Sequence, residues 1–256
     1  MRKPAAPVEA AAIASLPNDS AIELPFETRE LRKGLKSFLK RPVSVSGEIV
    51  KFAETSDTHT RSVGSFQWGV YAFFDYDGEP IYVGQTNEQL SARIGRHLTN
   101  QRTDAVAMSV LDPFEVCSVA VWPLPQFDGI KGTDVAAKAH LNALEYEVFQ
   151  KLLKASKFRA VLNEKVPAKP HQRIALRKEL KARIVSTEVS KLRDHPDLRI
   201  ARRALTLSRL AQVISERKVG KGLRMTLLTQ AKRLEWLAER RVAKAPEVSE
   251  SDESDA

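Results

Sequence analysis

The sequence predicts an α+β fold, in which a small three-stranded antiparallel sheet is flanked by helices and is followed by a basic α-helical region. Residues 66–156 alternate between β-type runs and amphipathic stretches in the order β, β, α, β, α. Residues 165–245 have a different texture, because they hold 22 Lys and Arg against 7 Asp and Glu and only two glycines. The change in texture marks a boundary near Pro167.

The first predicted element is a helix over residues 27–40, in which leucines and a phenylalanine recur at helical spacing before Pro42 ends it. We expect this helix to be a docking element outside the core. Residues 66–74 and 80–84 are aromatic and β-branched runs on either side of Asp77-Gly78. Such runs around a turn dipeptide are typical of a β-hairpin.

A helix is predicted over residues 88–100, where Leu90, Ile94 and Leu98 share one face. Residues 114–122 are rich in β-branched and aromatic side chains and predict a third strand. Residues 134–156 carry a long apolar stripe, which predicts the last helix of the α+β unit.

The basic region is expected to form three helices, over residues 170–193, 197–218 and 223–243. His195-Pro196 and the Gly220-Lys221-Gly222 stretch separate them. The predicted organisation is a disordered leader (1–26), an N-terminal helix and extension (27–65), an α+β domain (66–167), the basic helical region (168–245) and an acidic disordered tail (246–256).

The formal charge of +9 and the sequence pI of about 9.6 favour a polyanionic partner. No apolar run is long enough to cross a bilayer, so we expect a cytoplasmic protein without a membrane partner. The single cysteine, Cys117, excludes an intrachain disulfide and is expected to be a small buried hydrophobe.

Five short motifs follow one another in the α+β region. The predicted hairpin carries Gly69-Val70-Tyr71 and then Ile81-Tyr82-Val83-Gly84, and the next helix carries Leu90-x-x-Arg93 with His97. The last helix carries Leu144-Glu145, and it is followed by Leu162-Asn163. In this order they resemble the GIY-YIG nuclease family over about residues 66–165. Val70 and Val83 each stand where the family has Ile, and the spacing from Glu145 to Asn163 is longer than usual, with an extra loop at 155–159.

The resemblance implies a metal-dependent endonuclease with Tyr71, Tyr82, Arg93, His97, Glu145 and Asn163 in its site. Glu145 would bind a single Mg²⁺ or Mn²⁺, an ion that keeps most of its waters and needs only one or two carboxylates. Arg93 would hold phosphate oxygens in a planar fork, and Tyr71 would act as general base with Tyr82 beside it. His97 would hydrogen-bond to Tyr71 or phosphate, and Asn163 would hold the site together.

Alternatives remain at this stage. Both tyrosines could be cross-strand packing aromatics, and Arg93 and His97 could belong to a solvated helix face. Glu147 could be the metal ligand in place of Glu145, although the apolar pair that follows Glu145 makes Glu145 the better match to the family's glutamate. The partner is expected to be DNA, gripped by the basic region with its pairs Arg202-Arg203 and Arg240-Arg241. That region could instead be a solvated bundle.

A restriction or defence nuclease is the leading function. The alternatives are a structure-specific or single-strand DNA-processing nuclease in repair or recombination, and a non-catalytic DNA-binding protein that keeps the fold. A homo-oligomer is compatible with each of them.

Overall fold

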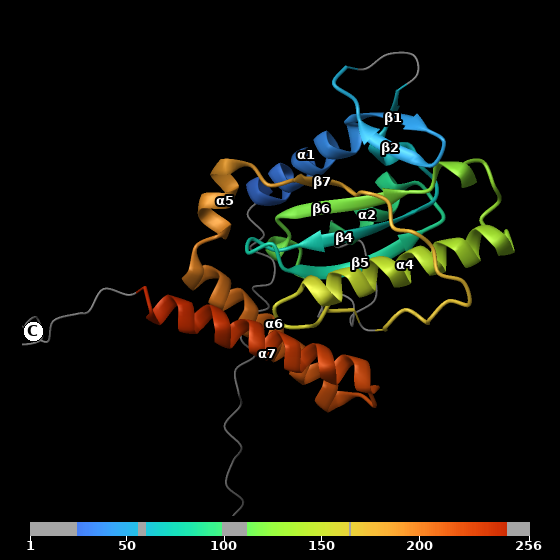
Figure 1. Ribbon diagram of the computed structural model, residues 1–256. Coiled ribbons are helices and arrows are strands. Elements are labelled where there is room, and N and C mark those ends of the chain that lie inside the picture. Colours follow the sequence, from blue (N-terminus) through green and yellow to red (C-terminus); the bar gives the residue numbers. More distant parts are fainter. Residues whose placement is uncertain (1–24, 56–59, 99–111, 164, 245–256) are drawn as a thin grey trace, which may run out of the picture.

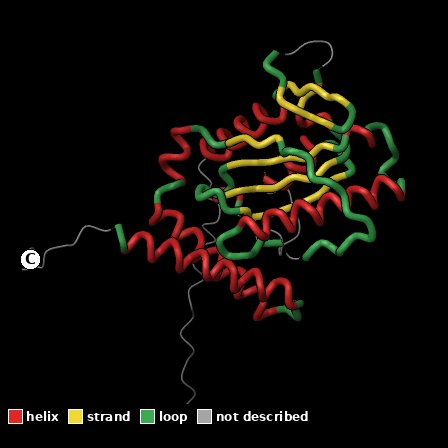
Figure 2. Tube along the Cα trace, viewed as in Figure 1, coloured by secondary structure: helices red, strands yellow, loops and turns green. Residues whose placement is uncertain are grey.

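The computed structural model describes residues 25–55, 60–98, 112–163 and 165–244. The expected disordered leader and acidic tail fall almost wholly outside these residues. Two sheets and a set of helices make up the described fold (Figures 1 and 2). Within it, no helix is long and apolar enough to cross a membrane.

The main sheet is antiparallel and has the strand order β5-β4-β6-β7. The predicted hairpin forms from β4 (Gly69–Phe74) and β5 (Pro80–Thr86), and the predicted third strand forms as β6 (Ser118–Pro123). Every residue of β4 is buried because both faces of this central strand are covered. The expected three antiparallel strands are therefore present, and a fourth is added.

The hairpin turn is stabilised by Asp75, whose Oδ1 accepts hydrogen bonds from the backbone N–H groups of Asp77 and Glu79, both at 2.9 Å. Gly78 has a φ of 77°, a left-handed conformation in which a side chain would be strained. The predicted turn at Asp77-Gly78 is confirmed.

Each face of the main sheet packs against different helices (Figure 1). Helix α4 (Val135–Ala155) covers one face, and the side chain of Asp134 caps its start by accepting from the N–H of Ala137. Helices α1 (Pro25–Lys40) and α2 (Leu90–Leu98) cover the other. These helices match the predicted ones in kind and closely in extent.

The expectation that the first helix lies outside the core is wrong. Its apolar stripe is buried in the core of the α2 face, with Phe38 only 2% exposed. A small sheet that the sequence did not suggest follows α1 and has the order β2-β1-β3, from β1 (Pro42–Ser46), β2 (Ile49–Phe52) and β3 (Arg61–Ser62). Residues 25–62 thus extend the core instead of docking on it.

The basic region is not helical throughout. The predicted helix over 170–193 is wrong for most of its length, because residues 165–179 are extended or irregular and β7 (Leu180–Arg183) pairs with β6 at the edge of the main sheet. Leu180 and Ile184 point into the core with an exposure of 3% and 1%. The segment forms a strand because its backbone pairs with β6 and its alternate side chains are buried, although its charged residues had been interpreted as part of a basic helix.

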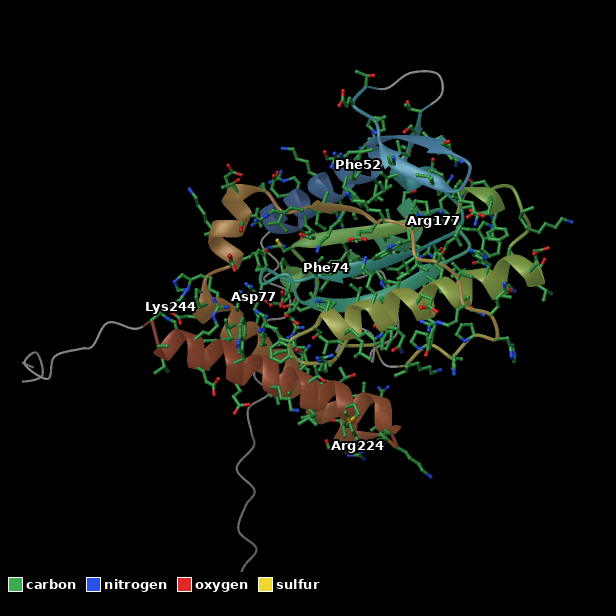
Figure 3. All side chains as sticks on the ribbon, viewed as in Figure 1. Phe52, Phe74, Asp77, Arg177, Arg224 and Lys244 are labelled. Carbon is green, nitrogen blue, oxygen red and sulfur yellow. The ribbon has the colours of Figure 1, made fainter. Side chains whose placement is uncertain are left out.

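The rest of the basic region is helical as predicted. A short helix, α5 (Thr187–Arg193), leads into α6 (Pro196–Glu216) and α7 (Lys221–Val242). Helices α6 and α7 pack against each other beside the turn end of the β4–β5 hairpin, where Asp77 lies (Figure 3). Two short 3-10 helices, η2 (Pro113–Glu115) and η3 (Pro125–Phe127), flank β6, and a third, η1 (Val63–Ser65), precedes β4.

Candidate active site

Four aromatic rings meet on the α2 face of the main sheet. On the hairpin, Tyr71 pairs with Gly84 and Phe73 pairs with Tyr82, so the three rings point to the same face. Helix α2 brings His97 onto them, with ring centroids 4.8 Å from Tyr82 and 5.6 Å from Tyr71. The predicted tyrosines and histidine are therefore joined in one cluster.

The hydroxyl of Tyr71 lies at the centre of this cluster. It is hydrogen-bonded to Nδ1 of His97 at 3.2 Å, and both side chains are buried. Tyr82 is only half-buried, so of the two phenol side chains it is the one that reaches the surface. The arrangement gives Tyr71 a proton acceptor within reach and leaves Tyr82 the more accessible to a ligand.

Gly84 makes the close packing of the two tyrosines possible. A Cβ at this position would lie 2.6 Å from both Cζ and the hydroxyl oxygen of Tyr71 and 2.8 Å from Cε1 of Tyr82. These separations are too short for non-bonded atoms, so a side chain here would displace the rings. The last glycine of the second motif thus shapes the site directly.

Arg93 lies one helical turn before His97 and is partly exposed. Burial disfavours its charged form, but a hydrogen bond to Tyr71 and the electrostatic influence of Tyr71, Tyr82 and Glu88 outweigh that effect, so the pKa of Arg93 is raised. Its Nε is buried and has no hydrogen-bond partner among the described residues. Arg93 is a permanent cation beside the phenols.

Glu145 lies on α4, on the other side of the sheet from α2. Its side chain is half-buried and forms no hydrogen bond or ion pair with any described residue. Burial alone raises the pKa of its carboxyl group to about 7. A half-buried carboxylate with no counter-charge in the protein is suited to an added cation.

Glu147 is engaged elsewhere. Its two carboxylate oxygens accept hydrogen bonds from Nε and Nη2 of Arg173 at 2.7 and 2.8 Å, and the pKa of Glu147 is lowered mainly by this bidentate contact. Of the two acidic residues on α4, only Glu145 therefore has a carboxylate available for a metal ion. No group of three or more His, Cys, Asp or Glu side chains is arranged to hold a metal among the described residues.

Asn163 lies along the outer edge of β5. Its side-chain amide donates to the carbonyl of Val83 at 2.7 Å and accepts from the N–H of Val83 at 3.0 Å, so it pairs with that residue as a neighbouring strand would. The N–H of Leu162 also donates to the carbonyl of Ile81. Asn163 thus supports β5 at Val83, the residue between Tyr82 and Gly84.

Residues 67–127 match the family model described as the GIY-YIG catalytic domain. Over these residues the chain is similar to a GIY-YIG catalytic domain. The matched residues include Tyr71, Tyr82, Arg93 and His97, whereas Glu145 and Asn163 lie beyond them. No curated protein and no solved structure matches the chain. The matched residues contain β4, β5, α2 and β6, and the match points to a nuclease-type domain there.

The four arginines predicted to bind DNA already have protein partners. Arg203 is 4% exposed and its guanidinium lies 3.0 Å from carboxylate oxygens of Asp75 and Glu115. Arg202 binds Glu115, and the partly exposed Arg240 and Arg241 pair with Asp77 and Asp197. The prediction for Arg203 is wrong, because a buried, saturated guanidinium cannot reach a phosphate.

The sequence reasoning missed the buried ionic cluster to which Arg203 belongs. Asp75 lies within 3.0 Å of both Arg203 and Arg233, and Arg199 pairs with Asp77. The pKa of Glu115 is lowered because the charges of Arg203, Arg199 and Arg202 outweigh the effect of its burial. The cluster fixes α6 and α7 to the turn of the β4–β5 hairpin and to η2. The sequence feature that could have indicated this cluster is the pair of acids at the hairpin turn, Asp75 and Asp77.

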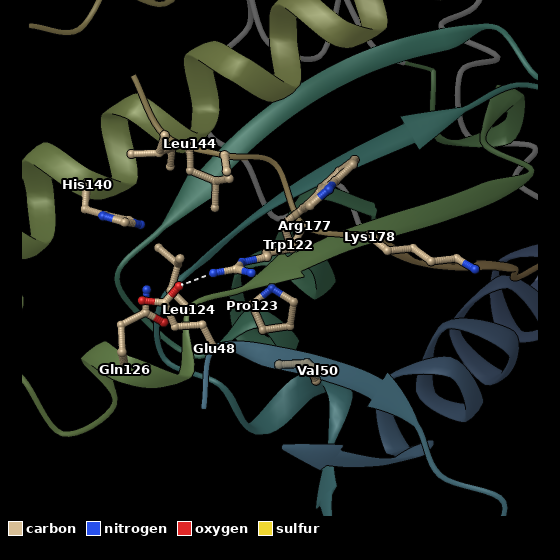
Figure 4. A pocket seen from close by; sticks show the side chains of 12 residues that line it. Glu48, Val50, Trp122, Pro123, Leu124, Gln126, His140, Leu144, Arg177 and Lys178 are labelled. Atoms are coloured by element: carbon tan, nitrogen blue, oxygen red, sulfur yellow. Dashed lines mark hydrogen bonds and ion pairs between the residues drawn. The ribbon is translucent and has the colours of Figure 1, made fainter. Parts of the chain in front are cut away.

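A separate hollow lies on the α4 side, where β2, the end of β6, α4 and residues 174–178 meet (Figure 4). Arg177 pairs with Glu48 across it, and burial lowers the pKa of His140 on its α4 wall. None of the predicted site residues lines this hollow. It is therefore distinct from the tyrosine cluster.

Proposed function

We propose that this protein is a metal-dependent DNA endonuclease that hydrolyses phosphodiester bonds in the cytoplasm, in restriction or another defence role. The observation that carries the proposal is the hydrogen-bonded cluster of Tyr71, His97 and Arg93 within a GIY-YIG domain. Phosphodiester hydrolysis needs a base for the attacking water and fixed positive charge at the phosphate. The cluster supplies both kinds of group.

Arg93 is the residue that we assign to the phosphate. Its raised pKa keeps it charged at all working pH values, and its partly exposed fork can hold two phosphate oxygens as negative charge develops. The buried Nε already lies in the plane of that fork without a protein acceptor among the described residues. Arg93 therefore binds and orients the scissile group.

Tyr71 and His97 form the proposed base. A phenol is a weak base near neutral pH, since its reference pKa is about 10. The Nδ1 atom of His97, 3.2 Å from the hydroxyl of Tyr71, can take the phenolic proton and so make the pair a better acceptor. Tyr82, the more exposed ring, orients the water or hydrogen-bonds to the phosphate.

Glu145 is the proposed ligand of a single Mg²⁺ or Mn²⁺. The donor fits, because it is an oxygen ligand with no competing cation, and one carboxylate is enough for an ion that keeps most of its waters. When bound, such an ion stabilises charge on the phosphate and leaving oxygens. Glu145 contributes by holding the ion through one half-buried carboxylate.

The test compares Glu145→Gln with the control Glu147→Gln on the same helix. Supercoiled plasmid, single-stranded DNA and branched DNA are each incubated with wild type and both variants, with and without Mg²⁺. We expect wild type and Glu147→Gln to cleave only with the metal and Glu145→Gln to be inactive. Wild-type cleavage by Glu145→Gln, or metal-independent cleavage, would contradict the metal assignment.

The same experiment separates the candidate roles. Discrete fragments from plasmid of known sequence would support restriction, whereas cleavage confined to branched or single-stranded DNA would support repair or recombination. DNA binding without cleavage on every substrate would support a non-catalytic protein that keeps the fold.

A further inference from the structure

Three cations lie along one face of α1. Arg32, Lys36 and Lys40 are spaced by four residues, so they recur about every 6 Å along the helix. All three side chains are exposed, and none forms an ion pair with a described residue. The neighbouring leucines of α1 are buried in the core, so the row of cations is held on a rigid element.

These cations form one wall of a groove between α1 and α2. Leu35 and Leu39 form its apolar floor, the rest consists of small or hydroxyl-bearing residues and Gln89, and no acidic side chain of the described residues lines it. The hydroxyl groups of Ser62 and Ser91 form no hydrogen bond with the other described residues, whereas that of Ser65 donates to the carbonyl of Ser62. A positively charged groove with uncommitted hydroxyl donors is complementary to a sugar–phosphate backbone.

The groove lies on α2 opposite the candidate active site. Ser91 and Gly95 line it, while Arg93 and His97 lie on the other flank of the same nine-residue helix. An α-helix is about 10–12 Å wide with its side chains. A DNA strand in the groove would therefore pass within about one helix width of Arg93.

The arginines of α6 and α7 offer much less free charge to DNA on the side facing the domain. Arg199, Arg203 and Arg233 neutralise buried carboxylates, and Arg240 and Arg241 are also paired. The cations of α1 have no such protein partners. Exposed cations without an ion pair to a described residue also lie around the α6–α7 connection, such as Arg217, Lys221 and Arg224, but the row on α1 is the one that lines a groove beside the candidate active site.

We propose that the groove between α1 and α2 binds the phosphate backbone of the DNA substrate, with Arg32, Lys36 and Lys40 each neutralising a phosphate. This proposal rests on the proposed function and adds a substrate-binding surface to it. Neutralising three phosphates on duplex DNA contributes about 2.7 to the slope of log affinity against log salt. If the affinities of wild type and of a variant without the three cations converge near 1 M salt, the variant binds about 100-fold more weakly at 0.15 M salt.

The test measures binding of a fluorescent 30-bp duplex by anisotropy in EDTA, at salt concentrations from about 0.05 to 0.5 M. Three triple variants with equal charge loss are compared with wild type. The first variant, Arg32→Gln/Lys36→Gln/Lys40→Gln, removes the groove cations. The second, Lys131→Gln/Lys138→Gln/Lys154→Gln, removes exposed lysines on the α4 side. The third, Arg217→Gln/Lys221→Gln/Arg224→Gln, removes exposed cations around the α6–α7 connection.

We expect only the groove variant to lose about 100-fold in affinity and nearly three units of salt slope. The single change Lys36→Glu should act in the same direction, and thermal unfolding checks that each variant folds. Equal effects of the first two variants, or a loss confined to the third, would overturn the groove proposal and leave the nuclease function standing. Failure of wild type to bind or cleave any DNA would instead reject the proposed function.

Discussion

Replacing Arg203 by methionine is expected to destabilise the protein strongly. The guanidinium of Arg203 bridges Asp75 and Glu115 at 3.0 Å and also donates to the backbone carbonyl of Arg233. Asp75 and Glu115 are 3% and 6% exposed, so neither carboxylate can recover water when the arginine is removed. Methionine keeps much of the apolar volume and deletes the charge.

The magnitude follows from this burial. Removing one partner of a buried ion pair typically costs about 3–5 kcal/mol, because the remaining charge is left uncompensated. Asp75 keeps Arg233 at 2.6 Å and Glu115 keeps Arg202 at 3.0 Å, so we expect the lower half of that range, about 3 kcal/mol. For a chain of this size, that corresponds to a fall of roughly 10 °C in the melting temperature.

The assay is urea unfolding followed by circular dichroism, with Arg241→Met as the matched control. Arg241 and Asp197 form an ion pair in which both side chains are more than 40% exposed, and such pairs contribute less than about 1 kcal/mol. We expect Arg203→Met to lower the midpoint and Arg241→Met to leave it nearly unchanged. A stable Arg203→Met variant that has lost DNA affinity would refute the structural role and restore the DNA contact first predicted for this residue.

Four further outcomes are expected. Arg93→Ala should lower the cleavage rate by about two orders of magnitude or more, because losing one transition-state contact typically costs about 3 kcal/mol, and lysine should rescue little; full rescue in the plasmid assay would show that charge alone is needed. Gly84→Ala should reduce cleavage by displacing Tyr71, and unchanged activity would contradict the close packing. Without metal, Glu145→Gln should stabilise the fold above pH 7 by on the order of 1–2 kcal/mol after allowing for solvent screening, but not at pH 4.5. The reason is that the pKa of Glu145 is about 7 in the folded state, above its ordinary value of 4.5, so ionisation of this carboxyl group lowers the stability of the fold. Equal stabilisation at both pH values would exclude this cause. Truncation after residue 167 should destabilise the domain, since it removes β7 and the partners of buried acids; an unchanged urea midpoint would show that the domain is complete without them.

The sequence predicted three strands of the main sheet but not the fourth, β7. The hairpin, α2, β6 and α4 follow from local periodicity, because each of these segments repeats its apolar residues at the period of its own structure. The segment over residues 180–184 also alternates, but it is short and lies among many cations, and it forms a strand only because the free edge of β6 accepts it. No local pattern reports the presence of that edge.

The arginines illustrate a second limit. A sequence shows where cations are dense, but their availability depends on carboxylates that are distant in the chain, such as Asp75 for Arg233. Pairing across 158 residues is set by tertiary packing alone. For this reason the arginines predicted to bind DNA in α6 and α7 are partly structural, whereas cations without an ion pair to a described residue lie on α1 and around the α6–α7 connection.

The sequence by itself determined which residue types fill the proposed site and on which elements they lie, because the order of the GIY-YIG-like motifs along the chain follows local structure. Only the tertiary structure favours Glu145 over Glu147 as the proposed metal ligand, since Arg173 binds Glu147 and leaves Glu145 without a partner among the described residues. It also decided that Tyr71 is buried against His97, whereas Tyr82 reaches the surface. The physical reason is that burial and ion pairing depend on what surrounds a side chain in space, which spacing along the sequence does not specify.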